Sequence, residues 1–178
     1  MSFTKFKIYE SNIWQGQCND IKVIFRPSVK IPANTIIDIS NVKNSSTGNS
    51  DICCPIQIRE ITNNDLSKNA TWIQSHGRLS VLTENEIPND KDTSFIFTVR
   101  NKQEKSVPRG GYFADISSNV NGNYYLSKAS KKIMSCDVSK NVDPSANYFL
   151  WFNYGGIETG PYSEEYAPIG TEGTYQGT

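Results

Sequence analysis

The sequence has a single histidine, no G-x-S-x-G segment and no excess of either charge, because 18 basic residues balance 18 acidic ones. A hydrolytic triad therefore has little support, and there is no positive field to attract nucleic acid. No apolar run reaches the roughly 18 residues that a membrane helix needs, and residues 1–9 lack the apolar core of a signal peptide. We therefore expect a soluble protein without a cofactor, a nucleic-acid partner or membrane insertion.

The four cysteines contain no C-x-x-C pair, so they do not indicate a zinc site. Cys53 and Cys54 are adjacent, and adjacent side chains in an extended chain point to opposite faces. They can therefore pair with different partners, for which Cys18 and Cys136 are the candidates. The alternative is that these cysteines are buried free thiols that act as small apolar side chains. We predict no metal site.

Alternating apolar residues dominate the first two-thirds of the chain. Ile21, Val23 and Phe25 alternate with Lys22 and Arg26, which is the period of a half-buried strand. The same alternation, bounded by turn residues, predicts further strands at residues 36–39, 56–61, 79–83, 95–99 and 112–116. The short spacings leave no room for crossover helices. The pattern predicts an all-β protein, an antiparallel β-sandwich of immunoglobulin-like or jelly-roll-like type.

Several polar segments invite a functional interpretation, but each is better explained as a turn. His76, a candidate base, precedes a glycine. Residues 89–92 could offer carboxylates to a calcium ion, but they include Lys91. Residues 109–111 form a single, unrepeated Arg-Gly-Gly element of the kind found in nucleic-acid-binding segments. Asn44 and Asn69 each begin an N-glycosylation sequon in a polar stretch that we expect to be a loop. We predict their modification only in a glycosylating compartment.

An ordered series of residues runs from 19 to about 117. It consists of an alternating strand before Pro27, an Ile-rich strand at 31–39, Trp72, a Gly-Arg-Leu step at 77–79, a Phe-rich strand at 95–99, and Asn101. This series resembles a β-sandwich domain, often repeated in tandem, of predicted surface proteins of algae, other protists and some of their large DNA viruses. Two positions depart from that pattern, since Asn34 stands where the family usually has Gly and Lys102 where Pro often follows. The resemblance implies a sandwich with a structural role and names no substrate.

The composition of the C-terminal third changes twice along the chain. Residues 147–154 form the most hydrophobic segment, which we expect either to be covered within the sandwich or to contact another subunit. We predict one sandwich domain over residues 1–154 and an extended arm over 155–178, because glycine and proline exclude a regular element there. The candidate assembly contacts of this arm are Tyr162, Tyr166, Ile169 and Tyr175. The alternative is a frayed terminus.

Three classes of function follow. The first is a non-enzymatic structural or assembly protein of a virus particle, surface layer or filament, which binds other protein subunits and is located in that particle or at a cell surface. The second is an extracellular adhesion or carbohydrate-binding module, whose stacking aromatics would be Trp14, Trp72, Tyr124 and Tyr125. The third, an enzyme, is not predicted, because the sequence shows no acid–base pair or nucleophile setting.

Overall fold

The computed structural model describes residues 2–11, 16–47, 57–102 and 111–134. Within these ranges the chain forms strands and two 3-10 turns, η1 (Thr62–Asn64) and η2 (Gln74–His76), and no α-helix. The strands are β1 (Phe3–Glu10), β2 (Cys18–Pro27), β3 (Ile36–Ser40), β4 (Leu66–Ile73), β5 (Arg78–Thr83), β6 (Thr93–Arg100), β7 (Tyr112–Val120) and β8 (Asn123–Ile133). The all-β class predicted from the alternation is confirmed.

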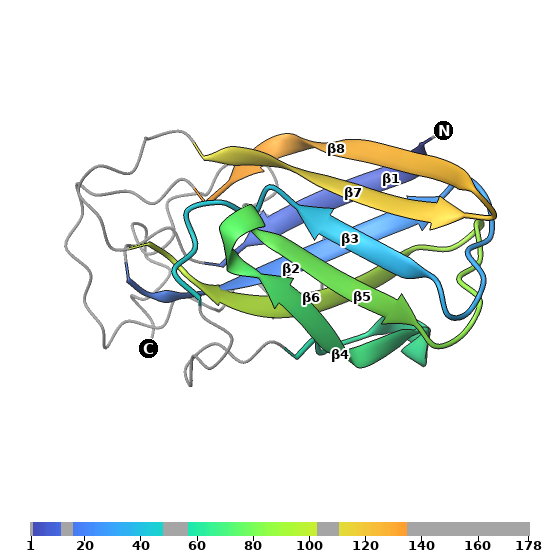
Figure 1. Cartoon of the computed structure of the whole chain (residues 1–178), viewed down its shortest axis with the longest axis horizontal. Helices are drawn as coiled ribbons and strands as arrows, with labels where there is room; N and C mark the ends of the chain where they lie inside the picture. The colour runs from blue at the N-terminus through green and yellow to red at the C-terminus, as the bar shows by residue number, and fades with distance from the viewer. Residues whose placement is uncertain (1, 12–15, 48–56, 103–110, 135–178) are drawn as a thin grey trace, which may run out of the picture.

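The strands build two antiparallel sheets that pack face to face (Figure 1). One sheet has the order β1-β2-β6 and the other the order β4-β5-β3-β7-β8. Every strand pair in both sheets is antiparallel. The antiparallel sandwich predicted from the sequence is therefore confirmed.

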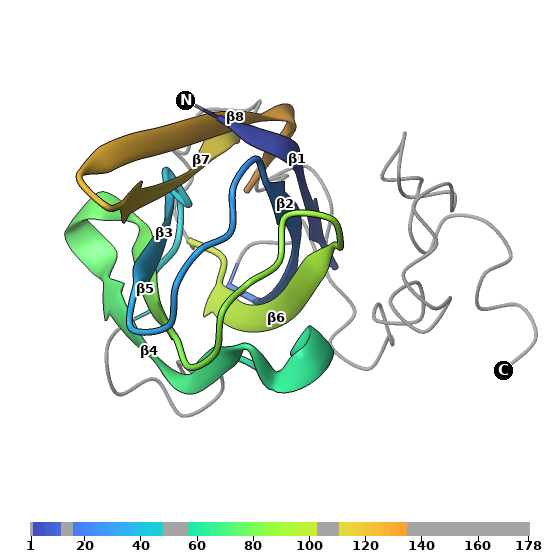
Figure 2. The ribbon, with the colours of Figure 1, turned by 90° about the vertical axis from the view of Figure 1, so that its right-hand side faces the viewer.

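Hydrogen bonds join the two sheets along both sides. Figure 2 shows β1 beside β8 in the view turned by 90°. On one side β1 lies beside β8, and the Phe3 amide donates to Ser127 Oγ at 2.9 Å. On the other side residues 57–59 bridge β4 and β6, where Arg59 and Ile96 exchange two backbone hydrogen bonds of 2.9 Å. The sandwich therefore resembles a flattened barrel at these points, and hydrogen-bonding groups at the sheet edges are used internally.

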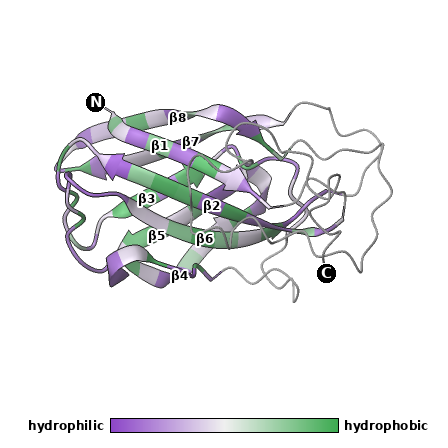
Figure 3. Ribbon diagram, turned by 180° about the vertical axis from the view of Figure 1, so that it is seen from behind, coloured by the Kyte–Doolittle hydropathy of each residue, from purple (hydrophilic) through white to green (hydrophobic). Residues whose placement is uncertain are grey.

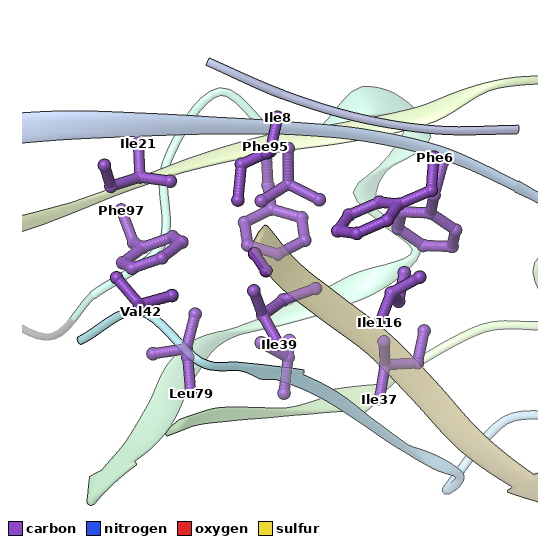
Figure 4. Packing of buried hydrophobic residues seen from close by; sticks show 14 of the residues in the cluster. Phe6, Ile8, Ile21, Ile37, Ile39, Val42, Leu79, Phe95, Phe97 and Ile116 are labelled. Atoms are coloured by element: carbon purple, nitrogen blue, oxygen red, sulfur yellow. The ribbon is translucent and has the colours of Figure 1, made fainter. Parts of the chain in front are cut away.

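The core lies between the sheets, where side chains from both inner faces interdigitate (Figure 4). Ile21, Val23 and Phe25 of β2 are each 0% exposed, as their alternation predicts. They face the inner residues of the five-stranded sheet, including Ile37 and Ile39 of β3. Burial of such a side chain contributes about 1.5–3 kcal/mol, so this core is the main source of stability.

Turns in this chain use asparagine where many proteins use glycine. Asn34 has a φ of 62°, and its amide donates to the Thr83 carbonyl at 2.8 Å. Asparagine tolerates this left-handed conformation better than most residues. The other asparagines with positive φ are Asn41, Asn44, Asn63, Asn64 and Asn121. Asn34 therefore fills a turn position where the resembled family has glycine.

The structure corrects two predictions about elements. Residues 57–61 contain isolated bridges at Gln57 and Arg59 rather than a regular strand. Asn69 lies in strand β4 and not in a loop. Its strand was missed because β4 is mostly polar, and the bulge between Leu66 and Ala70 breaks the alternation. Strand β1 was also missed. The segments 147–154 and 155–178 lie outside the described residues.

Candidate functional site

The outer face of the three-stranded sheet carries charges that are paired with one another. Asp92 accepts from Lys5 Nζ at 2.5 Å and from Arg26 Nη2 at 2.8 Å. Asp20 accepts from Arg59 Nη2 at 2.5 Å, next to Thr98. Figure 3 shows this sheet from its outer side, with hydrophilic and hydrophobic residues mixed along its strands. The two carboxylates Asp20 and Asp92 of this face are therefore engaged within the fold.

The ion pairs shift the pKa of Asp92. Partial burial raises the pKa of this carboxyl, but the hydrogen bonds and positive charges of Lys5 and Arg26 together outweigh that effect. The resulting pKa lies below the ordinary value of an aspartate. Asp92 is therefore held as an anion by the ion pairs with Lys5 and Arg26.

The outer face of the five-stranded sheet has the opposite character. All five large hydrophobic side chains that are exposed in the described residues lie on it: Ile36, Leu82, Phe113, Tyr124 and Leu126. We call this set the outer apolar patch. The strand register explains it, because directly paired residues share a face and alternate residues of a strand return to it. Ile36 of β3 pairs with Leu82 of β5, while Leu126 of β8 pairs with Ser117 of β7.

A polar groove of about 390 Å³ adjoins this patch. Its lining residues are Asp38, Ser40, Asn41, Lys43, Ser75, His76, Arg78, Ser117 and Tyr124. We call it the Arg78 groove. Tyr124 belongs to both the groove and the outer apolar patch, and it is 61% exposed. Hydrogen-bonding groups beside an exposed aromatic ring form a surface suited to binding.

The groove contains histidine, serine and aspartate, which are the residue types of a hydrolytic triad. Asp38 accepts a hydrogen bond from Ser80 Oγ, not from His76, so the base-orienting contact of a triad is not formed here. Among the described residues, no group of His, Cys, Asp and Glu side chains is arranged to hold a metal ion. The arrangement offers hydrogen bonds, charge and stacking, which are the interactions of binding.

The described part of the chain also contains no helix long and apolar enough to span a bilayer.

The predicted cysteine and arm sites are only partly placed by the structure. Cys18, at the start of β2, is disulfide-bonded, and its partner lies outside the described residues. Cys53, Cys54 and Cys136 lie outside those residues, as do the candidate assembly contacts Tyr162, Tyr166, Ile169 and Tyr175.

The two sequons differ in their surroundings. Asn44 is half-buried, and its side-chain amide donates to the Met134 carbonyl at 3.1 Å. A glycan on that nitrogen would have to displace this contact. Asn69 is exposed on the edge strand β4. Of the two predicted glycosylation sites, Asn69 is therefore the more accessible.

The four aromatics considered for sugar stacking fall into three groups. Trp72 and Tyr125 are buried core residues, at 4% and 8% exposure, so they cannot stack on a ligand. Trp14 lies outside the described residues. Tyr124 is the exposed member.

Ile36, Leu82 and Arg78 were not identified from the sequence as surface-site residues. The apolar doublets formed by Ile36 with Ile37 and by Val81 with Leu82 indicate strands that are apolar on both faces.

Comparisons with known proteins leave the family open. No family model matches the chain, and no curated protein matches it. An exo-β-N-acetylglucosaminidase from Vibrio harveyi is 11% identical, with a TM-score of 0.41, covering 82% of this chain and 20% of that one. A family GH18 chitinase from Chromobacterium violaceum is 9% identical, with a TM-score of 0.37, covering 71% of this chain and 18% of that one.

The reeler domain of human F-spondin is 8% identical, with a TM-score of 0.33, covering 74% of this chain and 91% of that one. This chain thus spans about a fifth of the length of the two bacterial enzymes. With every TM-score below 0.5, none of these similarities supports a function.

Proposed function

We propose that this protein is a non-enzymatic β-sandwich that acts through contacts with other protein subunits in a virus particle, surface layer or filament. The observation that supports the proposal is the outer apolar patch. Its five members all lie on one face of one sheet, although they come from four strands. Ile36, Leu82 and Tyr124 lie along one row across the strands, whereas Phe113 lies at the other end of β7. We propose this face as the subunit contact.

An exposed apolar face is costly unless something covers it. Single exposed hydrophobic residues are common, but gathered ones mark interaction surfaces more often than they mark bare solvent-facing sheet. Ile36 is 55% exposed and Leu82 is 41% exposed, and they pair directly across β3 and β5. A partner that covers both would gain roughly 25 cal/mol for each Å² of apolar surface removed from water.

The charge distribution supports a contact that does not depend on charge. The whole chain has a formal net charge of zero, and the described carboxylates on the opposite outer face are engaged in ion pairs. The resemblance of residues 19–117 to surface proteins of algae, protists and their viruses supports the location in the proposal. The arm over 155–178 would add contacts through its tyrosines.

Self-association of the full chain tests the proposal. The double variant Ile36→Ser with Leu82→Ser removes the centre of the patch without touching the core. We expect the wild-type protein to form larger species with rising concentration in light scattering, and the double variant to require at least about tenfold higher concentration to do so, the equivalent of about 1.4 kcal/mol.

The matched control is Lys128→Ser, which places the same new residue on the same face of β8 without removing a member of the patch. It should assemble like the wild type. A wild-type chain that stays monomeric at every concentration, or a double variant that assembles unchanged, would rule out this surface as a self-assembly contact.

A carbohydrate-binding module is the second candidate, and the exposure of Tyr124 beside the Arg78 groove favours it. A glycan array probed with the full chain tests this second candidate, whereas the self-association of the Ile36→Ser, Leu82→Ser variant tests the first.

A further inference from the structure

Arg78 differs from the other arginines in the described part of the chain. The other three are engaged: Arg26 with Asp92, Arg59 with Asp20, and Arg100 with the Gly16 carbonyl at 2.8 Å. Arg78 Nε is buried without a hydrogen-bond partner, which costs free energy. A guanidinium carries five donors in a rigid planar fork, so a ligand in the groove could satisfy several of them together.

The charged side chains that line the Arg78 groove are mostly cationic. Lys43 and Arg78 line it as cations, while Asp38 is its carboxylate. Asp38 already accepts a hydrogen bond from Ser80. Asn41, another lining residue, donates its side-chain amide to Asp115. Acceptor oxygens on a ligand would match the two cations, and a carboxylate in particular matches the geometry of the arginine fork.

The rest of the lining favours a sugar over a peptide. Ser40, Ser75 and Ser117 place hydroxyl groups along the groove, and Tyr124 presents an exposed ring at one side of it. A sugar ring has an apolar face that can lie on an aromatic ring, and hydroxyl groups around its edge. A groove of about 390 Å³ lies at the small end of ligand pockets, which suits a small saccharide unit.

We propose that the Arg78 groove binds a carboxylate-bearing sugar, such as a uronic acid unit of a glycan. Arg78 holds the carboxylate, the serine and asparagine side chains contact the hydroxyl groups, and Tyr124 stacks on the ring. This inference goes beyond the assembly proposal, because Ile36 and Leu82 do not line the groove.

Titration of the full chain followed by amide NMR signals tests the proposal. The probes are methyl glucuronide, the neutral methyl glucoside and acetate, so that sugar and carboxylate are supplied together and apart. We expect methyl glucuronide to shift the amide signals of groove residues, with the glucoside and acetate each binding about tenfold more weakly or less.

Two variants locate the interaction, and each has a matched control. Arg78→Gln should weaken glucuronide binding about tenfold or more, whereas Lys132→Gln removes a positive charge beside Phe113 on the same face and should leave it unchanged. Tyr124→Ser should weaken both sugars, whereas Leu126→Ser, on the same face of β8, should weaken neither. The dispersion of each variant's spectrum shows whether it is folded, and Arg78→Lys replaces Arg78→Gln if the latter does not fold.

Each contrary result overturns the proposal in a defined way. Methyl glucuronide that shifts no groove signal removes the site, and unchanged binding by Arg78→Gln removes the role of Arg78. Acetate that binds as well as the glucuronide makes the groove a simple anion site. An acidic peptide, added as a fourth probe, makes it a peptide site if it binds more tightly than the glucuronide. The Ile36→Ser, Leu82→Ser variant should retain glucuronide binding, so failure of assembly and failure of sugar binding remain distinguishable.

Discussion

Gly77 has no room for a side chain. Its φ is +56°, and a Cβ placed there would lie 2.5 Å from the Val42 carbonyl oxygen. Gly122 also has positive φ, at +81°, but a Cβ there meets nothing within 4 Å. We expect Gly77→Ala to lower the free energy of unfolding by about 2–3 kcal/mol and Gly122→Ala by about 1 kcal/mol. Urea denaturation measures both free energies of unfolding. Equal losses for the two variants would show that the close approach of the Val42 carbonyl oxygen adds no cost at Gly77.

Asp92 gives a pH-dependent prediction. Because its folded pKa lies below the ordinary value, its ion pairs stabilise the fold above the unfolded pKa of about 3.9, and this contribution is lost as the pH falls through the folded pKa. We expect Asp92→Asn to lower the free energy of unfolding by about 0.5–1 kcal/mol at pH 7, since the side chain is partly exposed.

The difference between Asp92→Asn and wild type should shrink in acid, where the wild-type carboxyl is also neutral. Denaturant titrations at neutral and strongly acidic pH check this. A difference that is constant with pH would mean that the ion pairs are not its source.

At the scale of elements, a buried polar cluster ties together the strand ends at one end of the sandwich. Asn19 of β2 is 0% exposed and donates to Glu10 at the end of β1 at 2.9 Å and to Asn101, just after β6, at 3.0 Å. The Met134 amide, just after β8, also donates to Glu10 at 2.9 Å. The cluster therefore fixes four chain segments against one another.

Replacing Asn19 tests the role of this cluster. Asn19→Leu has a similar size but removes the hydrogen bonds with Glu10, Asn101 and the Ser11 amide. We expect the free energy of unfolding to fall by about 2–4 kcal/mol, because buried polar groups lose their partners. Hydrogen exchange should speed up first at Ser11 and Met134. Wild-type stability and exchange would show that the cluster is not a structural tie.

The elements missed from the sequence were those in which regular alternation fails. In β1, Phe6 and Ile8 follow the period of two, but the register shift between Phe3 and Lys5 takes Phe3 out of that period. In β4 only Leu66 and Trp72 are buried hydrophobic residues, and a bulge lies between them. A period-two pattern cannot reveal a strand whose period is interrupted, because bulges are set by pairing with the neighbouring strand.

At the scale of the whole molecule, the Cys18 disulfide adds a constraint that the core does not supply. A disulfide stabilises mainly by restricting the unfolded chain, typically by about 2–4 kcal/mol. We expect reduction to lower the free energy of unfolding of the wild type by about that amount. Cys18→Ser should lower the free energy of unfolding under oxidising conditions, and a wild type unaffected by reductant would contradict this constraint.

The sequence by itself determined the all-β class and the inner faces of the main strands, because the alternation seen at Ile21, Val23 and Phe25 is a local property of the chain. Only the tertiary structure decided which outward residues meet. Ile36, Leu82 and Tyr124 are far apart in sequence, and they share one face because of the strand order β5-β3-β7-β8 and its register. Arg78 and Tyr124 likewise share a groove through pairing between distant segments, which no local pattern records.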